Sequence, residues 1–201
     1  RDHWPMNRRR QVLDPQVDEE WGIVSADTLQ GERGDTWSVL AGVQVFESLS
    51  PEELGLVDRI VHRRVYNPRE VIVNQGVPGV GMYIIESGSA EVVLDADDGR
   101  RTRLATLTDG NFFGEMSLLD GSPRAASVIA TERSQLIGFF RADLMDLIAR
   151  SPRLGFKIVS RITQLLAERL RSTVKEYRSL EASLRDLEVH EQKDELDPSQ
   201  V

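Results

Sequence analysis

The stretch that decides the fold runs from Gly110 to Val128 and reads GNFFGEMSLLDGSPRAASV. Two glycines flank a pair of aromatic residues, and EMSLL then has the character of one short helical turn. Amides at the start of a helical turn offer hydrogen-bond donors to an anion. Arg124 follows on a loop that Pro123 stiffens, and its planar fork suits two phosphate oxygens. The stretch therefore predicts a site for a small anion.

Glu115 adds a second chemical requirement to this site. An ionised carboxylate only accepts hydrogen bonds, so its natural partner is a hydroxyl or another donor. One acid, one arginine and backbone amides together fit a ligand that carries both a phosphate and a sugar hydroxyl. Neither a metal cluster nor a nucleophile–base pair stands nearby in the sequence, so we expect a binding protein and no enzyme. The plainer alternative is that Glu115 and Arg124 only pair with each other to hold a loop.

Outside this stretch the pattern is that of a mainly β domain. Short runs rich in Val and Ile alternate with glycine turns at residues 71–73, 82–85, 90–94, 103–107, 127–130 and 135–139. Strands at this spacing predict an all-β roll or barrel. The aspartates within residues 95–98 lack the spacing of a calcium loop and read as a hairpin turn.

Helical segments flank the predicted strands. Ser50-Pro51-Glu52-Glu53 has the form of a capping box and predicts a helix that runs to about His62. After Phe140 a helical pattern is broken at Ser151-Pro152, and a second, long helix follows to about His190. We divide the chain into an N-terminal extension or linker (1–36), the roll with its flanking helices (37–152), the long helix (153–190) and an acidic tail (191–201).

Composition excludes several classes of protein. The 201 residues carry a formal net charge of −8, which argues against non-specific nucleic-acid binding by the chain as a whole, and we expect no nucleic-acid partner. There is no cysteine, so disulfides and thiolate metal sites are excluded. No apolar run has the length of a membrane span or a signal peptide. We expect a cytoplasmic protein with no membrane partner, no metal and no cofactor.

FGEMSLL at 113–119 and PRAASV at 123–128 closely resemble the phosphate-binding cassette of cyclic-nucleotide-binding domains. The spacing of the acid and the arginine, nine positions, is similar to that of protein kinase A regulatory subunits. The resemblance extends over about residues 37–175 and includes MYIIESG at 82–88. It implies a double-stranded, jelly-roll-like cyclic-nucleotide-binding β-roll with flanking helices, followed by a long C-terminal helix.

The same resemblance implies roles for the cassette residues. Glu115 would accept a hydrogen bond from the ribose 2′-hydroxyl, and Arg124 would bind the cyclic phosphate. The amides of Gly114, Met116 and Ala125 would add donors. The candidate ligand-binding residues are Gly114, Glu115, Met116, Ser117, Arg124, Ala125, Ala126 and Thr173.

Two positions bear on the choice of base. In the kinase branch of the family, alanine follows the arginine in cAMP-preferring sites and threonine in cGMP-preferring ones, so Ala125 favours cAMP over cGMP. AERLRST at 167–173 resembles the dimer helix of the catabolite activator protein, where a threonine approaches the adenine. Thr173 is therefore a candidate base contact, and simple packing is the alternative.

The long helix carries a heptad pattern. One heptad position holds Leu170, Tyr177 and Leu184, and the other holds Leu166, Thr173, Leu180 and Leu187. This predicts a coiled-coil homodimer, parallel or antiparallel, with a lone helix folded onto the roll as the alternative. The favoured function is a cAMP sensor that signals through this helix to an effector. The alternatives are a regulatory domain of a larger enzyme and a dimerisation module with a relict pocket.

Overall fold

The computed structural model describes residues 36–96 and 98–195. The chain divides into two compact units, Arg1–Val159 and Ser160–Val201. Almost all of the predicted N-terminal extension, and residues 196–201 of the predicted tail, lie outside the described residues. Within the described part, no helix combines the length and the apolar character that a membrane span requires.

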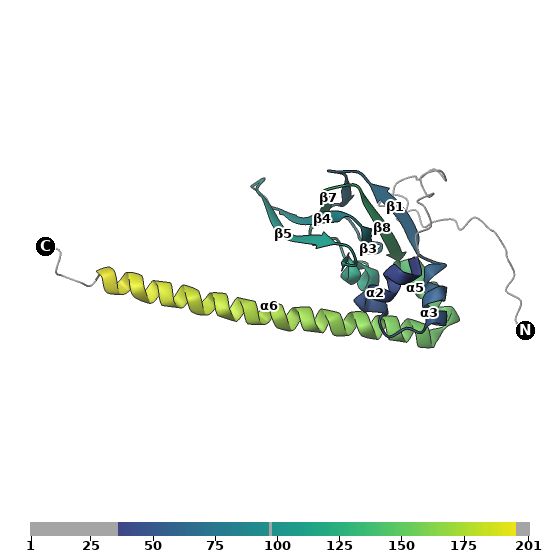
Figure 1. Cartoon of the computed structure of the whole chain (residues 1–201). Helices are drawn as coiled ribbons and strands as arrows, with labels where there is room; N and C mark the ends of the chain where they lie inside the picture. Colours follow the sequence, from purple (N-terminus) through teal and green to yellow (C-terminus); the bar gives the residue numbers. More distant parts are fainter. Residues whose placement is uncertain (1–35, 97, 196–201) are drawn as a thin grey trace, which may run out of the picture. The chain divides into compact units, whose positions relative to one another are not determined.

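The first unit is built on two antiparallel four-stranded sheets among the described residues (Figure 1). The strands are β1 (His62–Tyr66), β2 (Val71–Val73), β3 (Gly81–Ser87), β4 (Ser89–Asp95), β5 (Arg101–Thr108), β6 (Phe112–Phe113), β7 (Ser127–Ala130) and β8 (Ser134–Phe140). The order is β1-β8-β3-β6 in one sheet and β2-β7-β4-β5 in the other. The predicted β-roll with flanking helices and a long C-terminal helix is thus confirmed.

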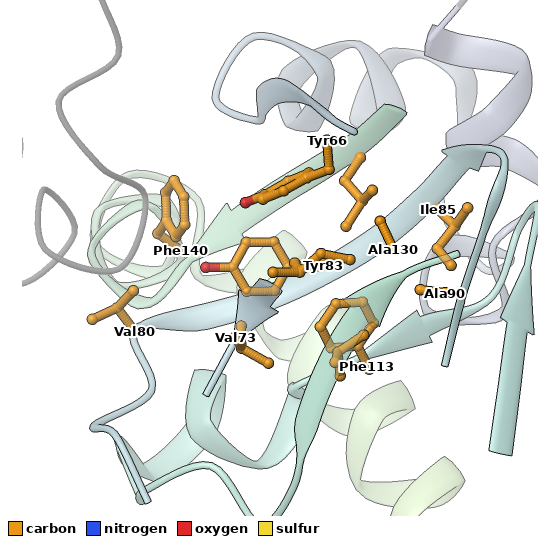
Figure 2. Packing of buried hydrophobic residues seen from close by; sticks show 12 residues of the cluster. Tyr66, Val73, Val80, Tyr83, Ile85, Ala90, Phe113, Ala130 and Phe140 are labelled. Carbon is orange, nitrogen blue, oxygen red and sulfur yellow. The ribbon is translucent and has the colours of Figure 1, made fainter. Parts of the chain in front are cut away.

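The core lies between the two sheets (Figure 2). Tyr83 on β3 stacks on Phe113, with 5.3 Å between ring centroids, and meets Phe140 edge-on at 6.2 Å. Such offset and edge-on pairs are favourable beyond the area that they bury. The first five residues of β3 are all buried, which fits its apolar sequence and its place between β8 and β6. The first residues of β3 are therefore a fixed support for the segments that pack against them.

Helices flank the sheets. They are α2 (Thr36–Gly42), a 3-10 turn (Gln44–Phe46), α3 (Pro51–Asp58), α4 (Glu115–Asp120), α5 (Arg141–Arg150) and α6 (Pro152–Glu195). Figure 1 shows α2, α3 and α5 grouped at one end of the sheets. Gly155 lets the first turn of α6 approach α5, because a Cβ there would lie 3.0 Å from the Cα of Ile148.

The capping box of α3 is confirmed. The Ser50 Oγ accepts from the Glu53 amide at 3.3 Å, and the Ser50 amide donates to the Glu53 carboxylate at 2.8 Å. The Lys157 ammonium donates to the same carboxylate, with 2.7 Å to Oε2. The cap of α3 is thereby tied to the first turns of α6.

Two sequence-based boundaries were wrong. The helix predicted to reach about His62 ends at Asp58, and β1 begins at His62. The sequence pattern misses β1 because two adjacent charged residues interrupt its apolar character. On the folded roll Arg63 pairs with Glu86 and Arg64 pairs with Glu70. The long helix continues beyond His190 to Glu195, so the acidic tail begins as helix.

Candidate functional site

The cassette is held against the roll by the short strand β6. Phe113 pairs with Tyr83 of β3, and the chain then turns at Gly114 into α4. Gly114 has a φ of +82°, a left-handed conformation that favours glycine. A Cβ on Gly114 would overlap the Arg124 Nη1 and would lie 2.8 Å from the Gly81 carbonyl oxygen. Glycine is therefore required here for both the turn and the close approach of the arginine.

Arg124 is the buried cation of this site, with 5% of its surface exposed. Its Nη1 donates to the Gly81 carbonyl oxygen at 2.8 Å, and its guanidinium carbon lies 5.2 Å from the ring centroid of Tyr83. A guanidinium over an aromatic face is attracted to the ring quadrupole. The backbone is fixed as well, because the Arg124 amide donates to the Val77 carbonyl at 2.9 Å. The side chain is thus held in one orientation before any ligand arrives.

Ser117 lies on the side of α4 that faces Arg124. A Cβ on Gly79 would overlap the Ser117 Oγ and would lie 3.0 Å from the Arg124 Nε. Ser117 is 3% exposed, and the loop 74–80 therefore brings these three residues together. Glycine at position 79 thus leaves room for Ser117 and Arg124, whereas a Cβ on Gly81, the first residue of β3, would overlap the backbone of Phe139 and Phe140.

Glu115 begins α4 and is 6% exposed. Carboxylates and guanidinium groups are rarely this buried unless they are paired or serve a ligand. Two buried, oppositely charged side chains on one short segment can bind a molecule that offers both an anion and a hydroxyl. Among the described residues no group of three or more His, Cys, Asp or Glu side chains is placed to hold a metal ion.

The structure sorts the remaining candidate residues by exposure. Met116 is 55% exposed, Ala125 is exposed and Ala126 is partly buried, so these three lie at the surface of the cassette. Thr173 lies on an exposed part of α6 in the second unit, and its contact with a base stays a prediction.

Sequence reasoning missed the residues that hold Arg124. They are Gly79, Gly81 and Tyr83, about forty positions before the arginine. The pair of glycines around Val80, just before a buried apolar strand, is the signal that could have pointed to them.

Comparison with known proteins agrees with this geometry. The family model named cyclic nucleotide-binding domain matches residues 63–151, which include β6, α4 and Arg124. The predicted resemblance to cyclic nucleotide-binding domains is therefore confirmed over residues 63–151. The chain is 37% identical over 132 residues to the cyclic AMP receptor protein of Thermus thermophilus, which covers 66% of this chain and 59% of the relative. It is 36% identical over 92 residues to the cAMP-dependent protein kinase regulatory subunit of Colletotrichum orbiculare. That match covers 46% of this chain and 23% of the relative.

Solved structures agree with this resemblance. The crystal structure of the Thermus thermophilus catabolite activator protein matches with a TM-score of 0.62 and 36% identity, covering 69% of this chain and 63% of that one. A cyclic nucleotide-binding domain from Methylobacillus flagellatus matches with a TM-score of 0.62 and 27% identity. That match covers 70% of this chain and 79% of the solved one. The chain thus spans about six tenths of the length of the Thermus proteins that it matches.

The expectation that no nucleic acid is a partner stays a prediction. One relative, 27% identical over 135 residues and covering 67% of this chain and 58% of its own, is a CRP-like cAMP-activated global transcriptional regulator of Mycobacterium tuberculosis. The absence of catalytic activity and of a cofactor are likewise predictions, as is the cytoplasmic location.

Proposed function

We propose that this chain is a cAMP sensor, in which the cassette binds the nucleotide and α6 carries the signal to an effector. The observation that carries the proposal is the buried Arg124, fixed by Gly81 and Tyr83 on a segment that also buries Glu115. Burying a cation and an acid costs free energy, and a pocket for a charged ligand offsets that cost when the ligand binds.

The proposed contacts follow from the donors and acceptors of each residue. The Arg124 guanidinium is a planar fork of N–H donors, held by its bond to the Gly81 carbonyl, and it binds the cyclic phosphate. Glu115 accepts from the ribose 2′-hydroxyl. The amides of Gly114, Met116 and Ala125 donate to the phosphate, beside Ser117 and Ala126. The small side chain at Ala125 supports cAMP in preference to cGMP, because it offers no hydroxyl to the guanine amino group.

The output is assigned to α6 through a homodimer. Five large apolar side chains on the described part of the second unit are 41–66% exposed, namely Leu170, Val174, Tyr177, Leu180 and Leu184. Three of them recur every seven residues, which is the spacing of a coiled-coil seam. A second copy of the chain would present the same stripe and would cover it. Leu166 is partly buried, and the side chain of Leu187 lies outside the described residues.

The decisive experiment is a calorimetric titration with cAMP of the parent and of Arg124→Lys. A point charge cannot reproduce the planar fork, and a hydrogen bond to a charged group contributes about 1.5–3 kcal/mol, so binding should weaken about 10- to 150-fold.

Arg100→Lys is the matched control, because Arg100 is an arginine whose side chain is 84% exposed and pairs with Asp98 on the β4–β5 hairpin. It should bind cAMP as the parent does. A parent that binds no cyclic nucleotide would leave a dimerisation module as the function that the exposed stripe supports. Equal affinity of parent and Arg124→Lys would remove Arg124 from the site.

A further inference from the structure

The segment that follows the cassette helix pairs with the loop between β2 and β3 like two short strands. The Gly79 amide donates to the Ser122 carbonyl at 3.3 Å, and the Arg124 amide donates to the Val77 carbonyl at 2.9 Å. The Gly76 amide then donates to the Arg124 carbonyl at 2.8 Å. Regular pairing of β2 with β7 resumes where Val73 faces Val128.

One rung between these two stretches is made by a side chain. The Gln75 amide donates to the Ser127 Oγ at 2.9 Å and not to a backbone carbonyl. Within the described residues, no backbone hydrogen bond joins Ala125 or Ala126 to the facing loop. Ala125 is exposed, whereas Arg124 and Ser127 on either side are 5% and 4% exposed. The chain therefore bulges outward at Ala125 and Ala126.

The Ser127 hydroxyl is itself held in place by Asp95. The Ser127 Oγ donates to the Asp95 Oδ2 at 3.3 Å, while the Arg101 Nε donates to the Oδ1 at 2.6 Å. A hydroxyl has a single proton, so giving it to the carboxylate leaves the lone pairs of Ser127 for the Gln75 amide. The hydrogen bond from Arg101 lowers the pKa of Asp95, which keeps the carboxylate ionised as an acceptor.

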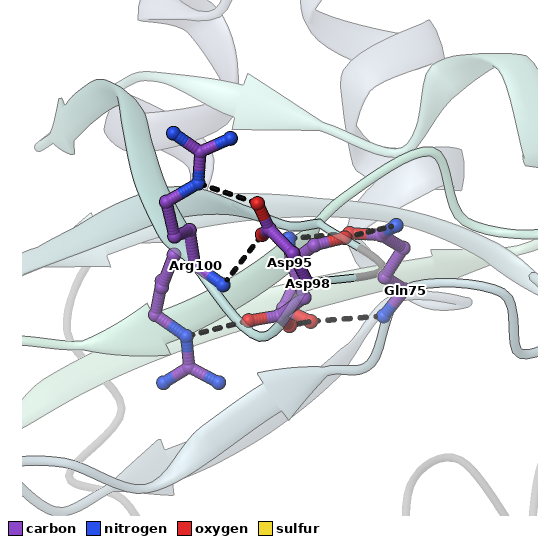
Figure 3. Close-up of polar contacts among 6 residues, drawn as sticks. Gln75, Asp95, Asp98 and Arg100 are labelled. Carbon is purple, nitrogen blue, oxygen red and sulfur yellow. Dashed lines mark hydrogen bonds and ion pairs between the residues drawn. The ribbon is translucent and has the colours of Figure 1, made fainter.

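Gln75 fixes Asp95 from the other side (Figure 3). The Asp95 amide donates to the Gln75 Oε1 at 2.9 Å, and the Gln75 Nε2 donates to the Asp95 carbonyl at 3.1 Å. The side chain of Gln75 thus binds the backbone of Asp95 twice, and its amide binds Ser127. Residues from β4, β7 and the loop before β3 thus form a closed ring of hydrogen bonds beside the bulge.

We infer that Ser127, oriented by Asp95, is a positioning residue for the proposed nucleotide site. Its hydroxyl replaces a backbone acceptor in the ladder, and the Ala125 amide consequently stays outside the ladder, where a phosphate oxygen can accept from it. The binding half of this inference rests on the proposed function. The structural half, that Ser127 keeps Ala125 out of the ladder, concerns the free protein alone.

Four variants test the inference, and each has a matched partner. Ser127→Ala removes the hydroxyl, and Ser127→Thr keeps it. Asp95→Ala removes the acceptor of Ser127, and Asp98→Ala removes a second aspartate of the same hairpin that pairs with Arg100 at 2.6 Å. The two aspartate variants change the net charge by the same amount, so Asp98→Ala controls for the loss of one negative charge on this hairpin. Affinity for cAMP, thermal unfolding and the exchange of the 15N-labelled Ala125 amide are measured for all four.

The expected result is specific. Ser127→Ala and Asp95→Ala should bind cAMP about tenfold more weakly, since one charge-assisted hydrogen bond is misplaced, while Ser127→Thr and Asp98→Ala stay within about twofold. In the parent, cAMP should shift the Ala125 amide resonance, and Ser127→Ala should lose that shift. In the free protein the Ala125 amide should exchange fast in the parent and more slowly in Ser127→Ala, because the bulge flattens once Gln75 takes a backbone acceptor.

Parent-like affinity in Ser127→Ala would overturn the inference, as would equal losses in Asp95→Ala and Asp98→Ala. A parent that binds no cyclic nucleotide would refute the proposed function instead. In that case the free protein decides the structural half, and unchanged exchange of Ala125 in Ser127→Ala overturns it.

Discussion

Adding one methyl group at Gly114 should weaken nucleotide binding by more than the strain of a left-handed backbone alone can explain. Gly114→Ala places a Cβ where it overlaps the Arg124 Nη1 and stands 2.8 Å from the Gly81 carbonyl oxygen. The φ of +82° also becomes unfavourable for alanine. Gly99→Ala is the matched control, because Gly99 has a φ of +81° and open space where its Cβ would stand.

The two variants share the cost of the left-handed conformation and differ in the displaced arginine. The shared strain should lower the free energy of unfolding by about 1–2 kcal/mol in each. In Gly114→Ala the guanidinium must also leave the Gly81 carbonyl, and a hydrogen bond to a charged group contributes about 1.5–3 kcal/mol. If the phosphate contact fails to the same extent, the affinity for cAMP falls about 10- to 150-fold.

Urea denaturation gives the first quantity and calorimetric titration with cAMP gives the second. Gly99→Ala should lose stability and keep the affinity of the parent. If Gly114→Ala binds cAMP as tightly as Gly99→Ala does, then the position of Arg124 against Gly114 does not matter for the ligand, and the reasoning from the close approach is refuted.

Three further outcomes are expected. Glu115→Gln should lose most of the preference of the parent for cAMP over its 2′-deoxy analogue; a parent that binds both nucleotides equally, by competition titration, would contradict the ribose contact. Leu180→Asp combined with Leu184→Asp should give monomers in analytical ultracentrifugation that still bind cAMP, and an unchanged dimer would place the interface elsewhere. The Lys157 ammonium lowers the pKa of Glu53 below its ordinary 4.5, so the stability from this pair is complete above pH 4.5 and lost as the pH falls through the folded-state pKa. Between about pH 6 and about pH 3 the melting temperature of the parent should therefore fall more than that of Glu53→Gln, and parallel pH profiles would exclude the pair as a source of stability.

Local patterns in the sequence were enough to predict most of the strands and the capping box of α3. The predicted hairpin turn lies between β4 and β5, and Ser50 and Glu53 make the reciprocal bonds of the capping box. Patterns of this kind depend on neighbours along the chain, so they can be recognised without the fold. β1 could not be recognised in this way, because its two arginines resemble solvent-exposed residues in the sequence. Their partners, Glu86 and Glu70, are brought beside them only by the fold.

The candidate site divides in the same way. Glu115 and Arg124 are identified by their spacing on one segment, and both prove to be buried. The partners that hold the arginine, Gly81 and Tyr83, come from a distant strand, and their role depends on the sheet that brings β3 to the cassette. The bulge beside Ser127 was equally hidden, since a side chain takes the place of a backbone acceptor there.

The contact between Gly155 and Ile148 has a mechanical consequence. It fixes the start of α6 against α5, and from that corner the helix continues for 44 residues in all. At this corner the two helices are so close that a Cβ at position 155 would overlap the Ile148 side chain and lie 3.0 Å from its Cα, so any side chain there would have to push the first turn of α6 away from α5.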